Sequence, residues 1–202
     1  MNRLTDVVKH LIIINVIVYV VFVFLFPQFQ VYSILHMPWG YGDQFAPVQL
    51  VTHMFMHDPN GFTHLLFNMM GLYFLGPHIE QTLGKERFLI FYLVCGFAAM
   101  GMHMLLSFIG VIGAVPVVGA SGAIMGIFVA FAILFPNTKL MLLFPPIPIK
   151  AKFLMGGLLL FDLFSGIGGF STGIAHFAHL GGALSGFALM ILWGYFDAKR
   201  FR

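Results

Sequence analysis

The chain has 202 residues, of which 60% are hydrophobic and 8% are charged, and its formal net charge is +3. In soluble domains roughly a quarter of the residues are charged, so this composition excludes an ordinary soluble protein and predicts an integral membrane protein. The small net charge gives no indication of a nucleic-acid partner, and a single cysteine, Cys95, excludes a disulfide within the chain. The length predicts one membrane domain over residues 1–202.

Six apolar segments predict helices that cross the membrane. A helix needs about 20 mostly apolar residues to span a bilayer, and fewer when other helices surround it. Turn residues, such as the Asp-Pro-Asn-Gly run at 58–61, separate the segments. The predicted helices are 8–26, 62–80, 87–108, 119–135, 150–168 and 173–196. The predicted fold class is therefore an all-α polytopic bundle with a long loop, residues 27–61, between its first two helices.

The ten Lys and Arg residues all fall on one side of this predicted topology. They precede the first helix, lie between helices two and three and between four and five, and follow the sixth, whereas loops 27–61, 109–118 and 169–172 have none. The positive-inside rule then predicts that both termini are cytoplasmic and that loop 27–61 is external.

Near the inner end of the second helix, His78 and Glu80 are expected to cap a helix or to bridge to Lys85 or Arg87.

Ser121 lies in the stretch VVGASGAIMGIF, residues 117–128, where glycines interrupt an apolar helix. The helix that follows reaches only Phe135 before Pro136, so it is too short to join the inner surface to the outer one. Ser121 is therefore predicted to begin this helix below the outer surface. His179 lies about six residues inside the outer end of the sixth helix, which predicts a similar depth of roughly 8–10 Å.

His64 and Asn68 lie four residues apart, on one face of the second helix and close to its outer end. Polar side chains inside a membrane span are costly and often indicate function. Each has a plainer interpretation on its own, His64 as an interfacial hydrogen-bonding group and Asn68 as a link between helices. Their common level with Ser121 and His179 favours a shared functional site.

Two Gly-x-x-x-Gly pairs follow the candidate residues. Gly122 and Gly126 come just after Ser121, and Gly182 and Gly186 come just after His179. Such pairs permit close approach of two backbones. They predict that the fourth and sixth helices pack together, although helix packing alone is the plainer interpretation of the glycines.

The predicted cluster contains the groups needed for acyl transfer. A serine hydroxyl becomes a nucleophile when a neighbouring base removes its proton, and histidine commonly serves as that base. The Ser121 backbone N–H, at the positive end of a helix dipole, and the side chains of His64 and Asn68 are candidate donors to an oxyanion. The sequence offers no evident carboxylate to orient His179, so the prediction is a Ser–His dyad.

Two further residues lie near the predicted site. His176, one helical turn from His179, is the second candidate for the base. Asp162 lies in the outer half of the fifth helix. It is a candidate for a hydrogen bond that holds a gate to the site closed, or for a carboxylate that faces water.

At these residues the sequence resembles the rhomboid intramembrane serine proteases. The resemblance runs through THMFMH (52–57), HLLFN (64–68), GPHIEQTLG (76–84), GASGAIMG (119–126) and AHFAHLGGALSG (175–186). It implies Ser121 as nucleophile, His179 as base, and His64, Asn68 and the Ser121 backbone as oxyanion donors, with Gly119 at the family's loop glycine. It also implies cleavage of transmembrane segments of other proteins near their outer ends, without metal or cofactor. The compact six-helix form is typical of bacterial members, which implies an inner (plasma) membrane protein whose site opens outward.

The sequence departs from the family pattern at several positions. Four residues after the serine the family commonly has an aromatic residue that packs on the catalytic histidine, and this chain has Met125. A thioether can still contact the edge of an imidazole. Val48 and Gln49 stand where the family often has Trp-Arg, and the interval from His57 to His64 is longer than usual.

Two other functions remain open at this point. A non-catalytic rhomboid-like protein would keep the fold and bind membrane clients. A transporter or metal-uptake protein could use a set of histidines, because helical spacings of three or four residues suit metal ligands; these are His53, His57, His64, His176 and His179. The sequence determines neither the natural substrate nor the oligomeric state.

Overall fold

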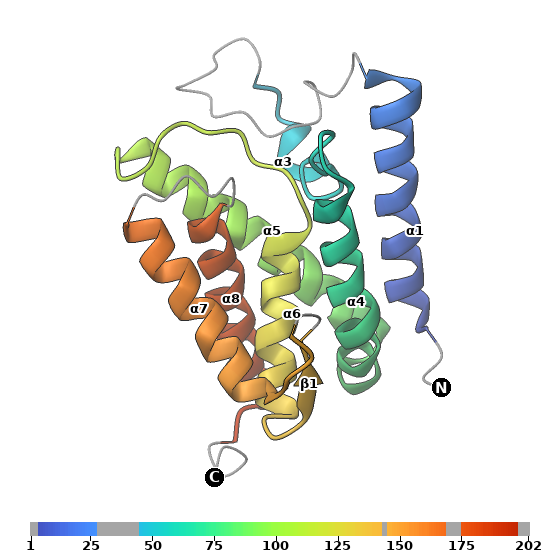
Figure 1. Cartoon of the computed structure of the whole chain (residues 1–202), viewed down its shortest axis with the longest axis vertical. Coiled ribbons are helices and arrows are strands. Elements are labelled where there is room, and N and C mark those ends of the chain that lie inside the picture. The colour runs from blue at the N-terminus through green and yellow to red at the C-terminus, as the bar shows by residue number, and fades with distance from the viewer. Residues whose placement is uncertain (1–3, 28–44, 143–144, 169–174, 198–202) are drawn as a thin grey trace.

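The computed structural model describes residues 4–27, 45–142, 145–168 and 175–197. These residues form a bundle of helices with a small two-stranded sheet at one end (Figure 1). The helices are α1 (Asp6–Val20), its π-helical continuation η1 (Val21–Leu25), α3 (Gln49–Thr52), α4 (Phe62–Leu83), α5 (Lys85–Phe108), α6 (Ser121–Leu134), α7 (Ala151–Ile167) and α8 (His176–Leu192). The strands β1 (Lys139–Met141) and β2 (Pro148–Lys150) pair antiparallel, with Lys139 opposite Lys150.

A helix occupies each of the six predicted segments, and the differences lie at the ends. Only Gly84 separates α4 from α5, and its φ of +81° reverses the chain where a residue with a Cβ would be strained. The predicted fourth helix began at residue 119, but Gly119 has a φ of +114°, so α6 begins at Ser121. The sixth helix ends at Leu192 and not at 196, and Gly194, with a φ of +75°, follows it.

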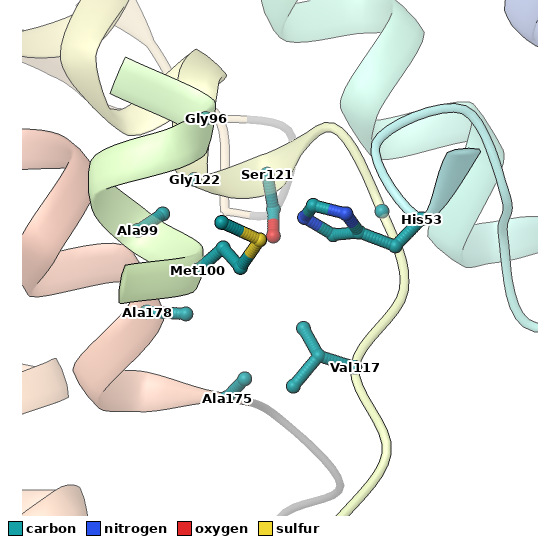
Figure 2. A pocket seen from close by; sticks show the side chains of 10 residues that line it. His53, Gly96, Ala99, Met100, Val117, Ser121, Gly122, Ala175 and Ala178 are labelled. Atoms are coloured by element: carbon teal, nitrogen blue, oxygen red, sulfur yellow. The ribbon is translucent and has the colours of Figure 1, made fainter. Parts of the chain in front are cut away.

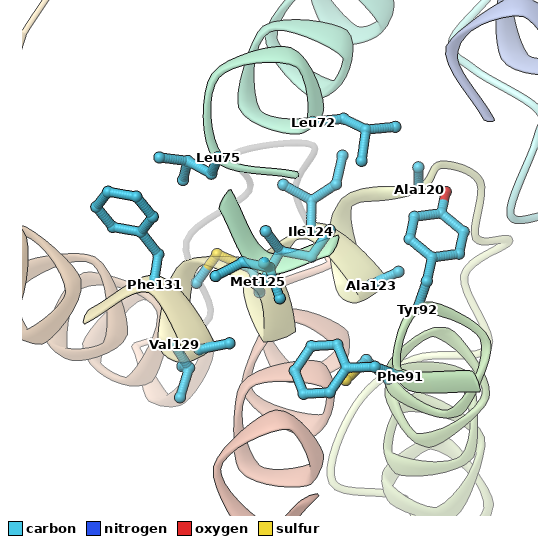
Figure 3. Close-up of a cluster of buried hydrophobic side chains, with 14 of the residues drawn as sticks. Leu72, Leu75, Phe91, Tyr92, Ala120, Ala123, Ile124, Met125, Val129 and Phe131 are labelled. Carbon is cyan, nitrogen blue, oxygen red and sulfur yellow. The ribbon is translucent and has the colours of Figure 1, made fainter. Parts of the chain in front are cut away.

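Helix α6 is the centre of the bundle. Nearly all of its residues are buried, because α4, α5, α7 and α8 pack around it. Figure 3 shows this core, in which side chains of α4 and α5 surround Ile124 and Met125 of α6. Helix α1 packs against α4 at one edge of the bundle, and α7 packs against α8 at the other (Figure 1).

Helices α6 and α8 meet through the two glycine pairs. A Cβ built on Gly182 would lie 1.9 Å from the carbonyl oxygen of Gly122, and one on Gly186 would lie 2.7 Å from Cα of Gly126. Both distances are far below ordinary van der Waals contact, so any side chain at Gly182 or Gly186 would push the helices apart. The two helix starts, with Ser121 on one and His179 on the other, are held together by this contact.

The surface of the bundle is apolar, whereas several polar side chains are buried. Soluble monomers rarely expose apolar patches of more than a few hundred Å², so this inverted pattern is that of a protein surrounded by lipid. Among the described residues, two helices are long and apolar enough to cross a membrane, Asp6–Leu25 and Lys85–Phe108. The count of six spans stays a prediction. The exposed apolar residues include Ile13, Ile17, Phe74, Ile90, Phe108, Phe153, Phe161, Phe164 and Leu192.

One end of the bundle gathers the basic residues. The start of α1, the α4–α5 junction, the β1–β2 hairpin and the end of α8 lie together there (Figure 1). The described Lys and Arg residues lie in these segments or, for Lys152, at the start of α7 directly after β2: Lys9, Lys85, Arg87, Lys139, Lys150 and Lys152. The remaining ones, Arg3, Lys199, Arg200 and Arg202, lie outside the described residues, as do loop 169–172 and residues 28–44 of the long loop.

Glu80 caps a different helix from the one that contains it. Its carboxylate oxygens accept hydrogen bonds from the backbone N–H groups of Val7 (3.1 Å) and Val8 (2.9 Å), at the start of α1. Of the two expectations, a cap or a bridge to Lys85 or Arg87, the cap is the one observed, and Lys85 forms its ion pair with Asp6. The buried carboxylate thereby satisfies two free N–H groups and attaches α1 to α4.

Candidate active site

Ser121 and His179 face each other across the α6–α8 contact. Ser121 is the first residue of α6, and His179 lies in the first turn of α8. The Oγ atom of Ser121 lies 2.9 Å from Nε2 of His179, which is hydrogen-bonding distance. The sequence separation is 58 residues, so the pair exists only because the two helices pack closely.

The loop that leads into Ser121 is attached to the segment before α4. The backbone N–H of Gly119 donates to the carbonyl oxygen of His53 at 2.8 Å. A Cβ on Gly119 would lie 2.8 Å from Cε1 and 2.9 Å from Nε2 of His64. Two features therefore require glycine at position 119: its positive φ, and the imidazole ring of His64 that packs directly against it.

His64 presents one ring nitrogen to a backbone donor. The N–H of Asp58 donates to Nδ1 of His64 at 3.2 Å. In a neutral imidazole the other nitrogen then carries the proton, so Nε2–H is a donor on the side of the ring that faces Gly119. The ring is held by this bond and by an edge contact with His57, whose centroid lies 5.2 Å away.

Asn68 lies one turn further along α4 and is buried. Its Nδ2 donates to the carbonyl oxygen of His64 at 2.8 Å, which leaves the second amide proton for another acceptor. Its Oδ1 has no hydrogen-bond partner in the described part of the chain. Neither Asn68 nor His64 hydrogen-bonds to Ser121 among the described contacts.

A small pocket lies beside the Ser121 hydroxyl, with room for about one water molecule. His53, Met100 and Val117 line it together with the glycines and alanines around Ser121, and Figure 2 shows the His53 ring and the Met100 thioether beside the hydroxyl. Ala175, just before α8, and Ala178, in the first turn of α8, complete the lining.

Asp162 is the residue of the site that the sequence left unplaced. It lies on α7 with 4% of its surface exposed, and its Oδ1 is 2.7 Å from Nδ1 of His176. Its two carboxylate oxygens are 3.2 and 3.3 Å from Nδ1 of His179. The sequence predicted a dyad without an orienting carboxylate, and the structure places a carboxylate on the far side of the His179 ring from Ser121. The one available signal was an acidic residue within an apolar helix.

Two histidines outside the helical spans are buried near the loop. His53 Nδ1 lies 2.9 Å from the carbonyl oxygen of Gln49, and His57 is 1% exposed with neither ring nitrogen hydrogen-bonded in the described structure. Burial lowers the pKa of each of these two histidines to about 4, so both are neutral at pH 7. In the described ranges, no three His, Cys, Asp or Glu side chains are arranged to hold a metal ion.

Met125 belongs to the hydrophobic core. It is 8% exposed and packs within the α4–α5–α6 cluster of Figure 3. The predicted contact between its thioether and the ring of His179 stays a prediction.

The fold and the site define a helical membrane protein in which a serine at a helix start is hydrogen-bonded to a histidine. Residues 44–196, more than half of the chain, match the family model of the rhomboid domain. The chain therefore belongs to the rhomboid family, a family of integral membrane proteins.

Curated relatives agree with this assignment. The chain is 40% identical over 95 residues to the putative rhomboid protease YdcA of Bacillus subtilis (strain 168), which covers 44% of this chain and 43% of that protein. It is 30% identical over 161 residues to the rhomboid protease AarA of Providencia stuartii, with 69% and 53% covered. It is 28% identical over 164 residues to the mitochondrial rhomboid protein 1 of Saccharomyces cerevisiae, with 76% and 43% covered. The chain thus spans about half the length of these relatives.

Proposed function

We propose that this protein is an intramembrane serine endopeptidase that cleaves transmembrane segments of other membrane proteins near their outer ends. The observation that carries the proposal is the 2.9 Å contact between Ser121 Oγ and His179 Nε2. Two of the relatives are named rhomboid proteases, one of them as putative, which supports the same reaction class.

The proposed reaction begins with proton transfer from the Ser121 hydroxyl to Nε2 of His179, as Oγ forms a bond to the scissile carbonyl carbon. The tetrahedral intermediate then collapses, the C–N bond breaks, and His179 returns the proton to the leaving amine. Water repeats the sequence on the acyl-enzyme, with His179 again as base, and releases the second product with Ser121 restored. The small pocket beside Ser121 is a suitable position for this water.

The oxyanion of the intermediate needs donors that are already in position. The Ser121 backbone N–H lies at the first position of α6, where helix N–H groups lack intrahelical partners and the macrodipole is positive. His64 Nε2–H faces the loop before Ser121, and Asn68 retains one free amide proton. We assign these three residues as the oxyanion donors.

The proposal includes a six-span topology with both termini in the cytoplasm and a site that opens to the outer face of a bacterial inner membrane. The described basic residues gather at one end of the bundle, which the positive-inside rule places inside. The starts of α6 and α8 lie toward the opposite end, near α3 (Figure 1). The substrates are accordingly membrane proteins that present a transmembrane segment from the bilayer.

A cleavage assay on the purified chain in lipid vesicles tests the proposal. The substrate is a single-span reporter protein, and the variants are Ser121→Ala, His179→Ala, His176→Ala and the control Ser185→Ala. Ser185 lies on α8 and its hydroxyl bonds to the Gly182 carbonyl oxygen, so its loss removes a serine of the same helix pair without touching the site. We expect cleavage to disappear with Ser121→Ala and His179→Ala and to persist with Ser185→Ala.

Undiminished cleavage by Ser121→Ala would exclude the serine mechanism. Loss of cleavage in His176→Ala, with full activity in His179→Ala, would assign the base to His176. Binding of the reporter without cleavage by the wild-type chain would favour the non-catalytic client-binding function.

A further inference from the structure

The carboxylate of Asp162 is buried in the apolar interface between α7 and α8. It is 4% exposed, and the side chains that reach it are the imidazoles of His176 and His179. A buried carboxylate is costly unless hydrogen bonds or opposite charges compensate it. Here both compensating groups are ring nitrogens, and both are Nδ1 atoms.

The two nitrogens of His179 face two different partners. Nδ1 lies 3.2 and 3.3 Å from the Asp162 oxygens, and Nε2 lies 2.9 Å from Ser121 Oγ. A carboxylate can only accept a hydrogen bond, so its neighbour Nδ1 must carry the proton. The neutral ring then has its lone pair on Nε2, which is the tautomer that can accept the Ser121 proton.

We propose that Asp162 is a positioning residue for His179, so that Ser121, His179 and Asp162 form a hydrogen-bonded triad instead of a dyad. This inference rests on the proposed protease function. Asp162 holds the Nδ1–H tautomer and the orientation of the ring, and its negative charge stabilises the imidazolium that forms when His179 takes the serine proton. No proton moves to Asp162, as in the serine–histidine–aspartate arrangement of soluble hydrolases.

His176 shares the Asp162 carboxylate with His179. Its Nδ1 is only 2.7 Å from Oδ1 of Asp162, and its ring, which is 5% exposed, also contacts the edge of Phe161 at 5.6 Å between centroids. This shorter bond fixes the carboxylate on α7 relative to α8. The rival explanation is that Asp162 serves only to join α7 to α8 through His176, with no effect on His179.

Kinetic measurements distinguish a role of Asp162 in positioning His179 from a purely structural link between α7 and α8. The isosteric variant Asp162→Asn offers an amide to His179 and loses the charge. We expect its kcat to fall about 10- to 100-fold, less than the roughly 10⁴-fold loss in a soluble triad because the carboxylate is shared and the contact is long. KM should change less than about threefold, and labelling of Ser121 by a small fluorophosphonate should slow in parallel with kcat. The matched control is Ser165→Ala, which removes a buried hydroxyl one turn along the same helix.

Two results would overturn the inference. One is a kcat of Asp162→Asn within threefold of the wild type while Ser121→Ala and His179→Ala are inactive, which refutes the triad and leaves the protease function intact. The other is an equal rise in KM for Asp162→Asn and His176→Gln with kcat unchanged, which shows a helix link alone. Cleavage that survives Ser121→Ala would instead refute the protease function itself.

A spectroscopic measurement needs no Asp162 variant and therefore does not depend on its folding. The ¹⁵N spectrum of histidine-labelled wild-type protein, with His179 assigned by its absence from His179→Gln, reports the tautomer directly. We expect His179 to carry its proton on Nδ1 at neutral pH. A proton on Nε2 would contradict the proposed role of Asp162.

Discussion

Gly182→Ala should inactivate the protein by a single added methyl group. The Cβ would lie 1.9 Å from the carbonyl oxygen of Gly122, and a backbone oxygen cannot rotate away as a side chain can. Restoring van der Waals contact requires α6 and α8 to separate by roughly 1.5 Å. The hydrogen bond of 2.9 Å between Ser121 and His179 spans the same two helices, so it would exceed hydrogen-bonding distance.

The expected effect on catalysis is larger than the effect on stability. A misplacement of about 1 Å costs on the order of 100-fold in rate. Overpacking costs about 1–3 kcal/mol, and the better helix propensity of alanine offsets about 1 kcal/mol of it. Reporter cleavage in vesicles should therefore fall at least about 100-fold, with thermal unfolding in detergent shifted only modestly.

A matched control isolates the steric effect. Gly157→Ala adds the same methyl group to α7, where nothing lies within 4 Å of the new Cβ, and it should retain cleavage. If Gly182→Ala cleaves the reporter within threefold of the wild-type rate, the close approach of α6 and α8 does not set the geometry of the site.

Three further outcomes are expected. Gly119→Ala should cost about 1–3 kcal/mol of stability and reduce cleavage at least tenfold, since its φ is +114° and its Cβ would meet the His64 ring at 2.8 Å; an unchanged rate would contradict this. Glu80→Ala removes both acceptors at the start of α1 and should lower the free energy of unfolding by about 1–3 kcal/mol, whereas the exposed Glu86→Ala should not. Burial lowers the pKa of His57 from 6.5 to about 4, so between these pH values the unfolded chain binds more protons than the folded one. The contribution of His57 to the free energy of unfolding should therefore be fully present above pH 6.5 and be lost as the pH falls towards 4. His57→Gln should reduce this loss, measured by thermal unfolding at pH 7 and pH 5.

The sequence predicted where helices form because apolar length and turn residues are local properties. It missed their ends at residues 84, 119 and 194, where glycines with positive φ redirect the chain. The short strands β1 and β2 were also missed, since three residues each carry no periodic signal. These errors move no helix out of its predicted segment.

The site was predictable to the extent that its residues lie on adjacent helix starts. The two glycine pairs and the short fourth helix predicted that Ser121 and His179 would lie at one level. Asp162 was recognised as unusual but not placed, because the rotation of α7 about its axis depends on packing against α8 and not on its own sequence. Glu80 was expected to cap or bridge locally, and its actual partner, the start of α1, is more than 70 residues away in the chain.

Covalent labelling of Ser121 is the most direct test of the central claim, that His179 activates this hydroxyl as a nucleophile. The purified chain is treated with a fluorophosphonate in lipid vesicles, and the modified residue is identified by mass spectrometry of the digested protein. We expect one adduct on Ser121 in the wild type and in Ser185→Ala, and none in His179→Ala. An adduct on another residue, or labelling of Ser121 at the wild-type rate in His179→Ala, would contradict the account.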